Sequence, residues 1–175
     1  PITEPGQARY EEMTSAMLGD LGGFGVLRSH RWPSWKSLKD GDGGYRAMAM
    51  ALKRARLAPD AIDYINMHGT ASAKNDEVEA ALVARRFPAR THASSTKGFT
   101  GHTLGAAGIV EAVISLLALE TGLMPGTVNS VTPDPVCGPQ IRLEPARGEV
   151  RYALSNSFGF GGNNCALIFG KGAAA

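Results

Sequence analysis

The chain has 175 residues, of which 43% are hydrophobic and 19% are charged. This length is enough to bury one core and too short for two large domains. Eighteen basic and sixteen acidic side chains leave a net charge of +2, and no run of like charges forms a tail that would bind a polyanion. We therefore expect one compact domain that does not bind nucleic acid.

The sequence shows only weak signals for a membrane span, for a signal peptide and for a metal site. The longest strongly apolar stretch, residues 106–119, is interrupted by Glu111 and is shorter than the roughly 20 residues that a bilayer crossing requires. Pro1 is not followed by the basic and apolar regions of a signal peptide. Cys137 and Cys165 are too few for a disulfide framework or a zinc site. We expect a cytoplasmic protein without a membrane span or a bound metal.

The first half of the chain predicts a strand, a helix and a second strand. Residues 18–27 form an apolar run broken by glycine, which is typical of a strand with a bulge. Apolar residues then recur at helical spacing from Gly44 until Pro59 ends the pattern. Ile62, Tyr64, Ile65 and Met67 then form a short apolar strand, and His68 follows at its end.

The middle of the chain predicts two helices separated by a strand. Helical spacing returns over residues 76–87, and a short segment of β-branched and small residues follows at 91–95. Residues from about 102 to 121 are apolar almost all round, with Gly122 at their C-terminal end. A helix of this composition is expected to lie buried between two layers.

The chain ends with two predicted strands, residues 152–155 and 165–169, which flank the glycine-rich segment 158–162. A connection this short favours antiparallel pairing, whereas the earlier alternation of strands and helices favours parallel pairing. We expect an α/β fold with a mixed, mostly parallel sheet and helices on both faces. Ligands of such sheets bind at the C-terminal ends of the strands.

Two histidines and a lysine lie where such a site is expected. His68 ends one strand, and a histidine there is as often a structural hydrogen-bonding residue as a catalytic one. Lys97 and His102 lie around the next strand-to-helix crossover. A helix N-terminus disfavours a positive charge on His102, so its neutral imidazole is suited to donate a hydrogen bond to a carbonyl or enolate oxygen. The alternative role of His102 is to cap the helix.

The other polar groups near this crossover have simpler interpretations. Glu111 is the acid in the middle of the apolar helix, and we expect it to form a structural ion pair with Lys97. Glycines in the segment 156–164 are expected to let backbone N–H groups approach a substrate oxygen, with Phe158 and Phe160 lining an apolar pocket. Neither cysteine has the cationic or helix N-terminal surroundings of an activated thiolate.

Three segments together resemble the elongating β-ketoacyl-ACP synthases, which have the thiolase fold. They are YINMHGT (64–70), STKGFTGH with GAAG (95–108) and NSFGFGG (156–162). The similarity runs from about residue 40 to 169 and implies the C-terminal half of a thiolase-like fold. By this resemblance residues 40–175 form the ketosynthase C-terminal domain. Residues 1–39 are then the end of the N-terminal half, with a strand and a connecting loop.

The resemblance implies a role for each residue that matches a family motif. His68 and His102 match the two active-site histidines, which promote decarboxylation of malonyl-ACP and stabilise the enolate and thioester oxygens. Lys97 matches the active-site lysine, and Glu111 matches its buried acidic partner. Phe160 matches the gating phenylalanine whose backbone N–H is one donor to the oxyanion.

Substrate delivery follows from the same resemblance. Thr70 and Ser72 match the hydroxyl pair that contacts the phosphopantetheine arm of acyl carrier protein, and no separate cofactor is expected. The chain departs from the family pattern at three places. Ser72 and Asn163 stand where threonine is usual, and Met67 stands where a smaller residue is common. These changes are expected to alter pocket width or contacts with the arm.

A larger departure is the family's nucleophilic cysteine, which lies in the N-terminal half and has no counterpart here. The implied function is decarboxylative Claisen condensation of an acyl thioester with malonyl-ACP, in fatty acid or polyketide synthesis. This chain supplies one half of that ketosynthase and needs a cysteine-bearing N-terminal half, in a homo- or heterodimer. Acyl transfer to the thiolate and attack by the enolate are separate steps, and we expect only the second step's groups in this chain.

Two alternatives stay open. A non-catalytic subunit, like a chain-length factor or a scaffold, keeps the fold and shapes a partner's tunnel, although such proteins commonly lack the active-site histidines. A thiolase or acyl-CoA-binding protein pairs one histidine with a second cysteine, and Cys165 would have to take that role.

Overall fold

The structure is a computed structural model that describes residues 24–27, 42–159 and 163–171. Its strands are β1 (Phe24–Leu27), β2 (Tyr64–Asn66), β3 (His92–Ser94), β4 (Leu123–Met124), β5 (Ala146–Arg147), β6 (Tyr152–Phe158) and β7 (Asn164–Lys171). Its α-helices are α2 (Asp42–Ala55), α3 (Ala73–Arg86), α4 (Lys97–Thr100) and α5 (Ala107–Thr121). Two 3-10 turns are η2 (Pro59–Ala61) and η3 (Leu104–Ala106).

Five strands form the main sheet, in the order β1-β7-β6-β2-β3. Strand β2 pairs in parallel with both β3 and β6, whereas β7 pairs antiparallel with β6 and with β1. Among these strands β7 therefore runs against the other four. The expected mixed, mostly parallel sheet is confirmed, including the antiparallel pair that ends the chain.

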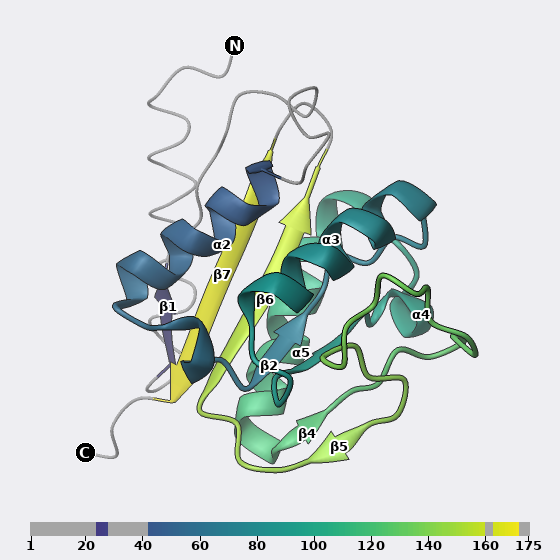
Figure 1. The fold of residues 1–175 in the computed structure, drawn as a ribbon. Coiled ribbons are helices and arrows are strands. Elements are labelled where there is room, and N and C mark those ends of the chain that lie inside the picture. The colour runs from purple at the N-terminus through teal and green to yellow at the C-terminus, as the bar shows by residue number, and fades with distance from the viewer. Residues whose placement is uncertain (1–23, 28–41, 160–162, 172–175) are drawn as a thin grey trace.

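Helices cover both faces of this sheet. Helices α2 and α3 lie on one face and α5 lies behind the other (Figure 1). Side chains that follow one another in a strand point to opposite faces. Thus Ile65 joins the core under α2 and α3, whereas its neighbour Tyr64 packs with Ala112 and Leu119 of α5. The two cores hold the sheet between its helical layers.

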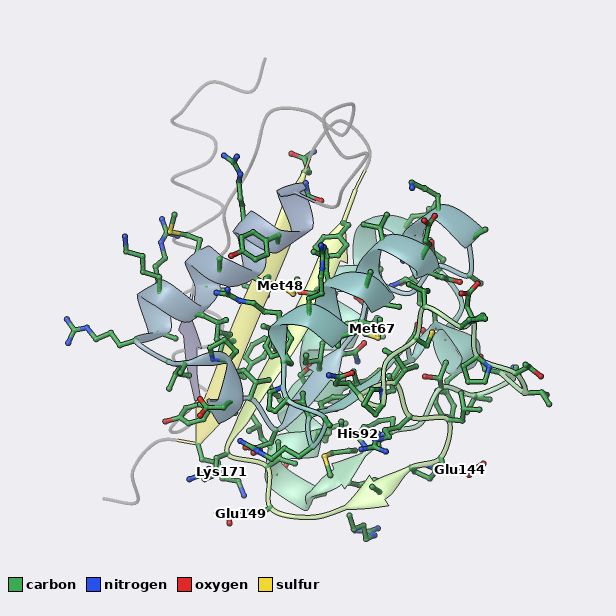
Figure 2. The ribbon with its side chains drawn as sticks, in the orientation of Figure 1. Met48, Met67, His92, Glu144, Glu149 and Lys171 are labelled. Carbon is green, nitrogen blue, oxygen red and sulfur yellow. The ribbon has the colours of Figure 1, made fainter. Side chains whose placement is uncertain are left out.

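Helix α2 follows the predicted apolar spacing. Met48 and Ala51 are fully buried and Leu52 nearly so, and Figure 2 shows Met48 on the side of α2 that faces the sheet. The last turn carries Lys53 and Arg54, whose charges suit the negative end of the helix dipole. Side chains at the surface in the same view are Glu144, Glu149 and Lys171.

Helix α3 begins three residues before the predicted start at residue 76. Ser72 caps it by accepting a hydrogen bond from the backbone N–H of Asn75, as serine commonly does at a helix N-terminus. The buried face of the helix contains Glu79 as well as Ala80, Leu82 and Val83. A carboxylate on this face was not foreseen from the apolar spacing.

The helix predicted from about residue 102 begins only at Ala107, so this prediction was wrong at its N-terminal end. Gly101 and Leu104 adopt positive φ angles of 70° and 52°, which a right-handed helix excludes. The chain instead forms the short helix α4 and the turn η3 before α5 starts. The C-terminal end agrees, because Gly122 has a φ of 71° and its N–H donates to Ala118 O, a common glycine cap.

Helix α5 is buried on one side only, not all round as we expected. Its buried residues include Glu111, Ala112 and Leu119. The opposite side exposes three apolar side chains one turn apart, Ile109, Val113 and Leu117, each about half exposed at 48–50%. We call these three residues the α5 stripe. By length and composition alone, residues 104–121 would also qualify as a membrane span, but here α5 packs against β2, β6 and β7.

A second, smaller sheet was not predicted. Strands β4 and β5 pair antiparallel, and the segment between them returns to the edge of the main sheet at β3. There Ala93 N–H donates to Gln140 O, and Arg142 N–H donates to Ala93 O. This segment, residues 125–142, is thereby anchored beside β3.

Some predictions lie outside the described residues. They include the part of the first strand before Phe24, the boundary between residues 39 and 40, and Phe160. The remainder of that strand, β1, pairs with β7 in the register Phe24↔Lys171.

Candidate active site

The site lies where β2 and β3 end. These parallel neighbours pair up to Asn66↔Ser94, and His68 and Lys97 follow two and three residues later. Because the C-terminal ends of parallel strands meet at one edge, residues 29 positions apart come together. Inside this edge, Asn66 Nδ2 donates to Thr96 Oγ1 at 3.1 Å, which joins the two strand ends.

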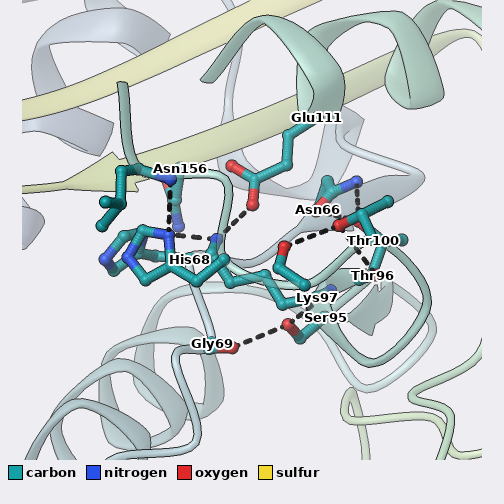
Figure 3. Close-up of polar contacts among 12 residues, drawn as sticks. Asn66, His68, Gly69, Ser95, Thr96, Lys97, Thr100, Glu111 and Asn156 are labelled. Carbon is teal, nitrogen blue, oxygen red and sulfur yellow. Dashed lines mark hydrogen bonds and ion pairs between the residues drawn. The ribbon is translucent and has the colours of Figure 1, made fainter. Parts of the chain in front are cut away.

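Lys97 connects the acidic and the imidazole groups of the site (Figure 3). Its Nζ forms an ion pair with the buried carboxylate of Glu111 and lies 3.5 Å from His68 Nδ1. The ion pair predicted from the sequence is present. Burial raises the pKa of the Glu111 carboxyl, and the hydrogen bond and charge of Lys97 oppose that rise.

The two histidines face each other. The rings of His68 and His102 meet edge to face with centroids 5.7 Å apart, and the ring of Phe158 lies 5.7 Å from His68 on another side. Burial, the charge of Lys97 and the neighbouring His102 together lower the pKa of His68 to about 4. His68 is therefore a neutral imidazole at physiological pH.

His102 does not lie at a helix N-terminus, contrary to our expectation, because α5 starts five residues later. The backbone N–H of Leu104 instead donates to His102 Nδ1 at 3.3 Å. A neutral imidazole that accepts at Nδ1 carries its proton on Nε2. Since Lys97 donates toward His68 Nδ1, both histidines are set up as Nε2–H donors. This arrangement suits hydrogen bonding to a negatively charged oxygen.

Glu79 is part of the site and was missed from the sequence. Its carboxylate is 1% exposed and accepts hydrogen bonds from the backbone N–H groups of His68 and Gly69, both at 2.9 Å. It also accepts from the side chains of Asn75 and Asn156. Burial raises its pKa, and these hydrogen bonds oppose the rise. The signal that could have found it is the helical spacing of this acid with Leu82 and Val83, which places it on the apolar face of α3.

The remaining predicted residues have different outcomes. The hydroxyls of Thr70 and Ser72 lie 3.0 Å apart at the surface beside His68, so Ser72 keeps a hydroxyl where the family pattern has threonine. Phe160 lies outside the described residues. The backbone carbonyl of Asn163 accepts the Gly159 N–H at 2.7 Å. The roles of these residues in binding and catalysis stay predictions.

The two cysteines, Cys137 and Cys165, form no disulfide bond with a described residue. Burial and the charge of Asp134 raise the pKa of Cys137, whereas a nucleophilic cysteine needs a lowered one. Cys165 lies within β7, opposite Ser157 of β6.

Comparisons with known proteins agree with this geometry. Residues 33–131 match the family described as beta-ketoacyl synthase, C-terminal domain. The chain is 44% identical over 138 residues to a mitochondrial 3-oxoacyl-[acyl-carrier-protein] synthase of Arabidopsis thaliana, covering 75% of this chain and 30% of that protein. It is 47% identical over 136 residues to 3-oxoacyl-[acyl-carrier-protein] synthase 2 of Rhizobium meliloti, covering 74% and 32%.

Solved structures show the same relationship. A ketosynthase of Xenorhabdus doucetiae, in complex with its chain length factor, superposes with a TM-score of 0.71 at 36% identity, over 85% of this chain and 38% of that one. A type II polyketide ketosynthase in complex with its acyl-carrier protein gives 0.68 at 28% identity, over 87% and 38%. The chain spans about a third of the length of the curated relatives it matches. It has a thiolase-like ketosynthase fold, and it belongs to the β-ketoacyl synthase family, of which it carries the C-terminal domain.

Proposed function

We propose that this chain supplies the decarboxylation and oxyanion side of a β-ketoacyl-ACP synthase, and that a cysteine-bearing N-terminal portion supplies the acyl-carrying side. The observation that carries the proposal is the contact of His68 with both His102 and Lys97. Two imidazoles with Nε2–H donors beside a lysine–glutamate pair suit a reaction that forms an enolate.

The reaction proceeds in two stages. A cysteine thiolate first attacks the carrier-bound acyl thioester and takes the acyl group, and the carrier leaves as a thiolate that takes up one proton. Malonyl-ACP then loses its carboxylate as carbon dioxide, and the electrons of the broken C–C bond form an enolate whose oxygen accepts hydrogen bonds from His68 and His102. The enolate carbon attacks the acyl thioester, and the cysteine leaves as a thiolate that takes up one proton. The products are β-ketoacyl-ACP, carbon dioxide and the free thiol.

Carrier-borne substrates reach the site past Thr70 and Ser72. Both hydroxyls lie at the surface next to the His68 loop, within reach of an arm that extends from a carrier protein docked outside. The curated relatives are named for acyl carrier protein, which supports this partner. The malonyl unit is the common feature of fatty acid and polyketide synthesis, and either is compatible with the site.

The α5 stripe supports the need for a second portion. Three half-exposed aliphatic side chains one turn apart form a surface that soluble proteins normally cover. We assign the N-terminal portion as its cover, because the matched relatives are about three times as long as the aligned region. The resulting ketosynthase is expected to act as a homo- or heterodimer in the cytoplasm.

The test uses the complete protein, with this chain joined to its N-terminal portion. His68→Ala and His102→Ala should each reduce carbon dioxide release from malonyl-ACP by about 100-fold or more, while mass spectrometry still detects acyl transfer to the cysteine. His92→Gln is the matched control, because His92 binds Pro125 O outside the site and glutamine keeps a donor there. Unchanged condensation in the double histidine variant would instead favour the scaffold function. A chain with no affinity for a supplied N-terminal portion would contradict the proposal.

A further inference from the structure

Ser95 lies between the two loops that carry His68 and Lys97. It follows the last residue of β3, and Figure 3 shows its side chain directed at Gly69. Ser95 Oγ donates a hydrogen bond to the Gly69 carbonyl at 2.9 Å and accepts one from the Lys97 backbone N–H at 3.4 Å. One hydroxyl thus contacts the residue after His68 and the backbone of Lys97 itself.

The contact with Gly69 is close as well as polar. Gly69 has a φ of +37°, and a Cβ added there would lie 2.4 Å from Ser95 Cβ and 2.5 Å from its Oγ. Only glycine permits this approach, because any side chain would push the two loops apart. The packing of Gly69 against Ser95 therefore sets how closely the His68 loop approaches the Lys97 loop.

A segment outside the main sheet holds the backbone of Ser95 in place. Its backbone N–H donates to Thr127 Oγ1 at 3.2 Å, and Thr127 N–H donates to Arg142 O at 2.9 Å. Arg142 is bonded in turn to Ala93 of β3. The segment 125–142 thereby fixes the backbone of Ser95, so its hydroxyl has a defined position from which to hold Gly69.

The His68 loop consequently has two anchors of different kinds. Glu79 holds the N–H groups of His68 and Gly69 from α3, and Ser95 holds the carbonyl of Gly69 from the end of β3. Bonds on both sides of one short segment restrict its orientation as well as its position. Loss of the Ser95 anchor frees the side that faces Lys97.

We propose that Ser95 is a positioning residue, which sets the separation of the His68 imidazole and the Lys97 ammonium group by holding the Gly69 carbonyl. The inference rests on the proposed function for its effect on the reaction, although its geometric part does not. Ser95 acts through His68 and is not assigned a contact with substrate.

Ser95→Ala tests the proposal in the complete protein. Removal of the hydroxyl should open the loop to water and move His68 away from Lys97. Decarboxylation of malonyl-ACP should fall about tenfold or more, because small misplacements of a reacting group are costly, while acyl transfer to the cysteine changes little. The pKa of His68, followed by NMR, should rise from about 4 toward its ordinary value of 6.5, because burial and the nearby charge of Lys97 are what lower it.

Ser94→Ala is the matched control. Ser94 is adjacent and fully buried, but its hydroxyl lies 3.4 Å from Tyr64 OH and does not contact Gly69. Ser94→Ala should leave both decarboxylation and the His68 titration near the wild-type values. Ser95→Thr keeps the hydroxyl, so it should also show near wild-type decarboxylation and His68 titration. If Ser95→Ala does not fold, Thr127→Val supplies the test. It removes only the acceptor of the Ser95 N–H and should shift the His68 titration in the same direction by a smaller amount.

Two results would overturn the inference. One is a Ser95→Ala protein with wild-type decarboxylation and an unchanged His68 titration. The other is an equal loss in Ser94→Ala, which would mark a general effect of removing a buried hydroxyl. Failure of the proposed function is distinguishable from both, because the wild-type protein itself would then release no carbon dioxide while the His68 titration still reported on Ser95.

Discussion

His68 Nδ1 lies 3.5 Å from Lys97 Nζ, and the same ammonium group is paired with the Glu111 carboxylate. Lys97 therefore directs one N–H toward an acid and another toward an imidazole nitrogen. The contact between Lys97 and His68 therefore disfavours a positive charge on His68, since the ammonium group would repel an imidazolium beside it.

The tautomers of the two histidines are a direct consequence. The rings of His68 and His102 should both carry a proton on Nε2, because each Nδ1 is an acceptor. Nitrogen-15 shifts of the imidazole rings distinguish Nδ1–H from Nε2–H. A proton on Nδ1 of either ring would contradict the hydrogen bonds described above.

Stability should depend on pH through His68. Its pKa is lowered from 6.5 to about 4 in the folded chain, so between these values the unfolded chain binds a proton that the folded chain does not. The free energy of unfolding should be unaffected by this group above pH 6.5 and should fall progressively as the pH drops to 4. Urea titrations across this range provide the measurement, and His68→Gln should flatten the dependence. An equally steep loss in that variant would assign the effect to other groups.

The Lys97–Glu111 pair should be costly to break at one end. Lys97→Met leaves the buried Glu111 carboxylate without its cation and should lower the free energy of unfolding by ~3–5 kcal/mol. The double variant Lys97→Met with Glu111→Leu should recover much of that loss, because no uncompensated charge is left. The exposed pair Lys74–Glu77, at 3.3 Å, is the control, and Lys74→Met should change stability by less than ~1 kcal/mol. Equal losses at the two sites would show that the burial of the pair is unimportant.

Glu79 should control the order of the His68 loop. Glu79→Gln places an amide NH₂ among N–H donors, so at least one of the His68 and Gly69 amides loses its acceptor. The expected cost is ~1–3 kcal/mol, with faster hydrogen exchange at these two amides. Glu77→Gln, on the exposed side of the same helix, should leave both exchange rates unchanged. Protection of the two amides in Glu79→Gln would show that another group orders the loop.

The α5 stripe should decide association with the N-terminal portion. Val113 is 48% exposed, so Val113→Asp should leave the folding of this chain nearly unchanged. A charge at the centre of a covered apolar surface should nevertheless weaken binding of the N-terminal portion by about 100-fold or more. Val131, which is 90% exposed and outside the stripe, provides the control variant Val131→Asp. Sedimentation of the mixed chains measures both, and unimpaired association of Val113→Asp would remove the stripe from the interface.

Much of the fold was predictable because the signals are local. Met48 and Leu52 belong to an apolar pattern at helical spacing, a proline follows α2 and a glycine follows α5. These signals depend only on short-range sterics and on which face of a helix is buried. The positions of His68 and Lys97 after consecutive strands also placed them at one sheet edge. Their family assignment came from three short motifs around these positions.

The start of α5 was not predictable from composition. Residues 102–106 contain no proline that would mark a break in the helix, yet Gly101 and Leu104 adopt left-handed backbone angles. Leucine rarely adopts such an angle, so no local pattern in the sequence indicates it. His102 consequently owes its tautomer to the Leu104 N–H and not to a helix dipole.

Periodicity and short motifs were enough to predict the strands and long helices of the main sheet, its mostly parallel pairing and the identity of the histidines and lysine. They did not indicate the smaller sheet of β4 and β5. Tertiary structure alone decided that Glu79 and Ser95 hold the His68 loop, and that α5 leaves three apolar side chains uncovered. The physical reason is that a hydrogen bond or an exposed face depends on strand register and helix packing, which bring together residues that no local pattern connects.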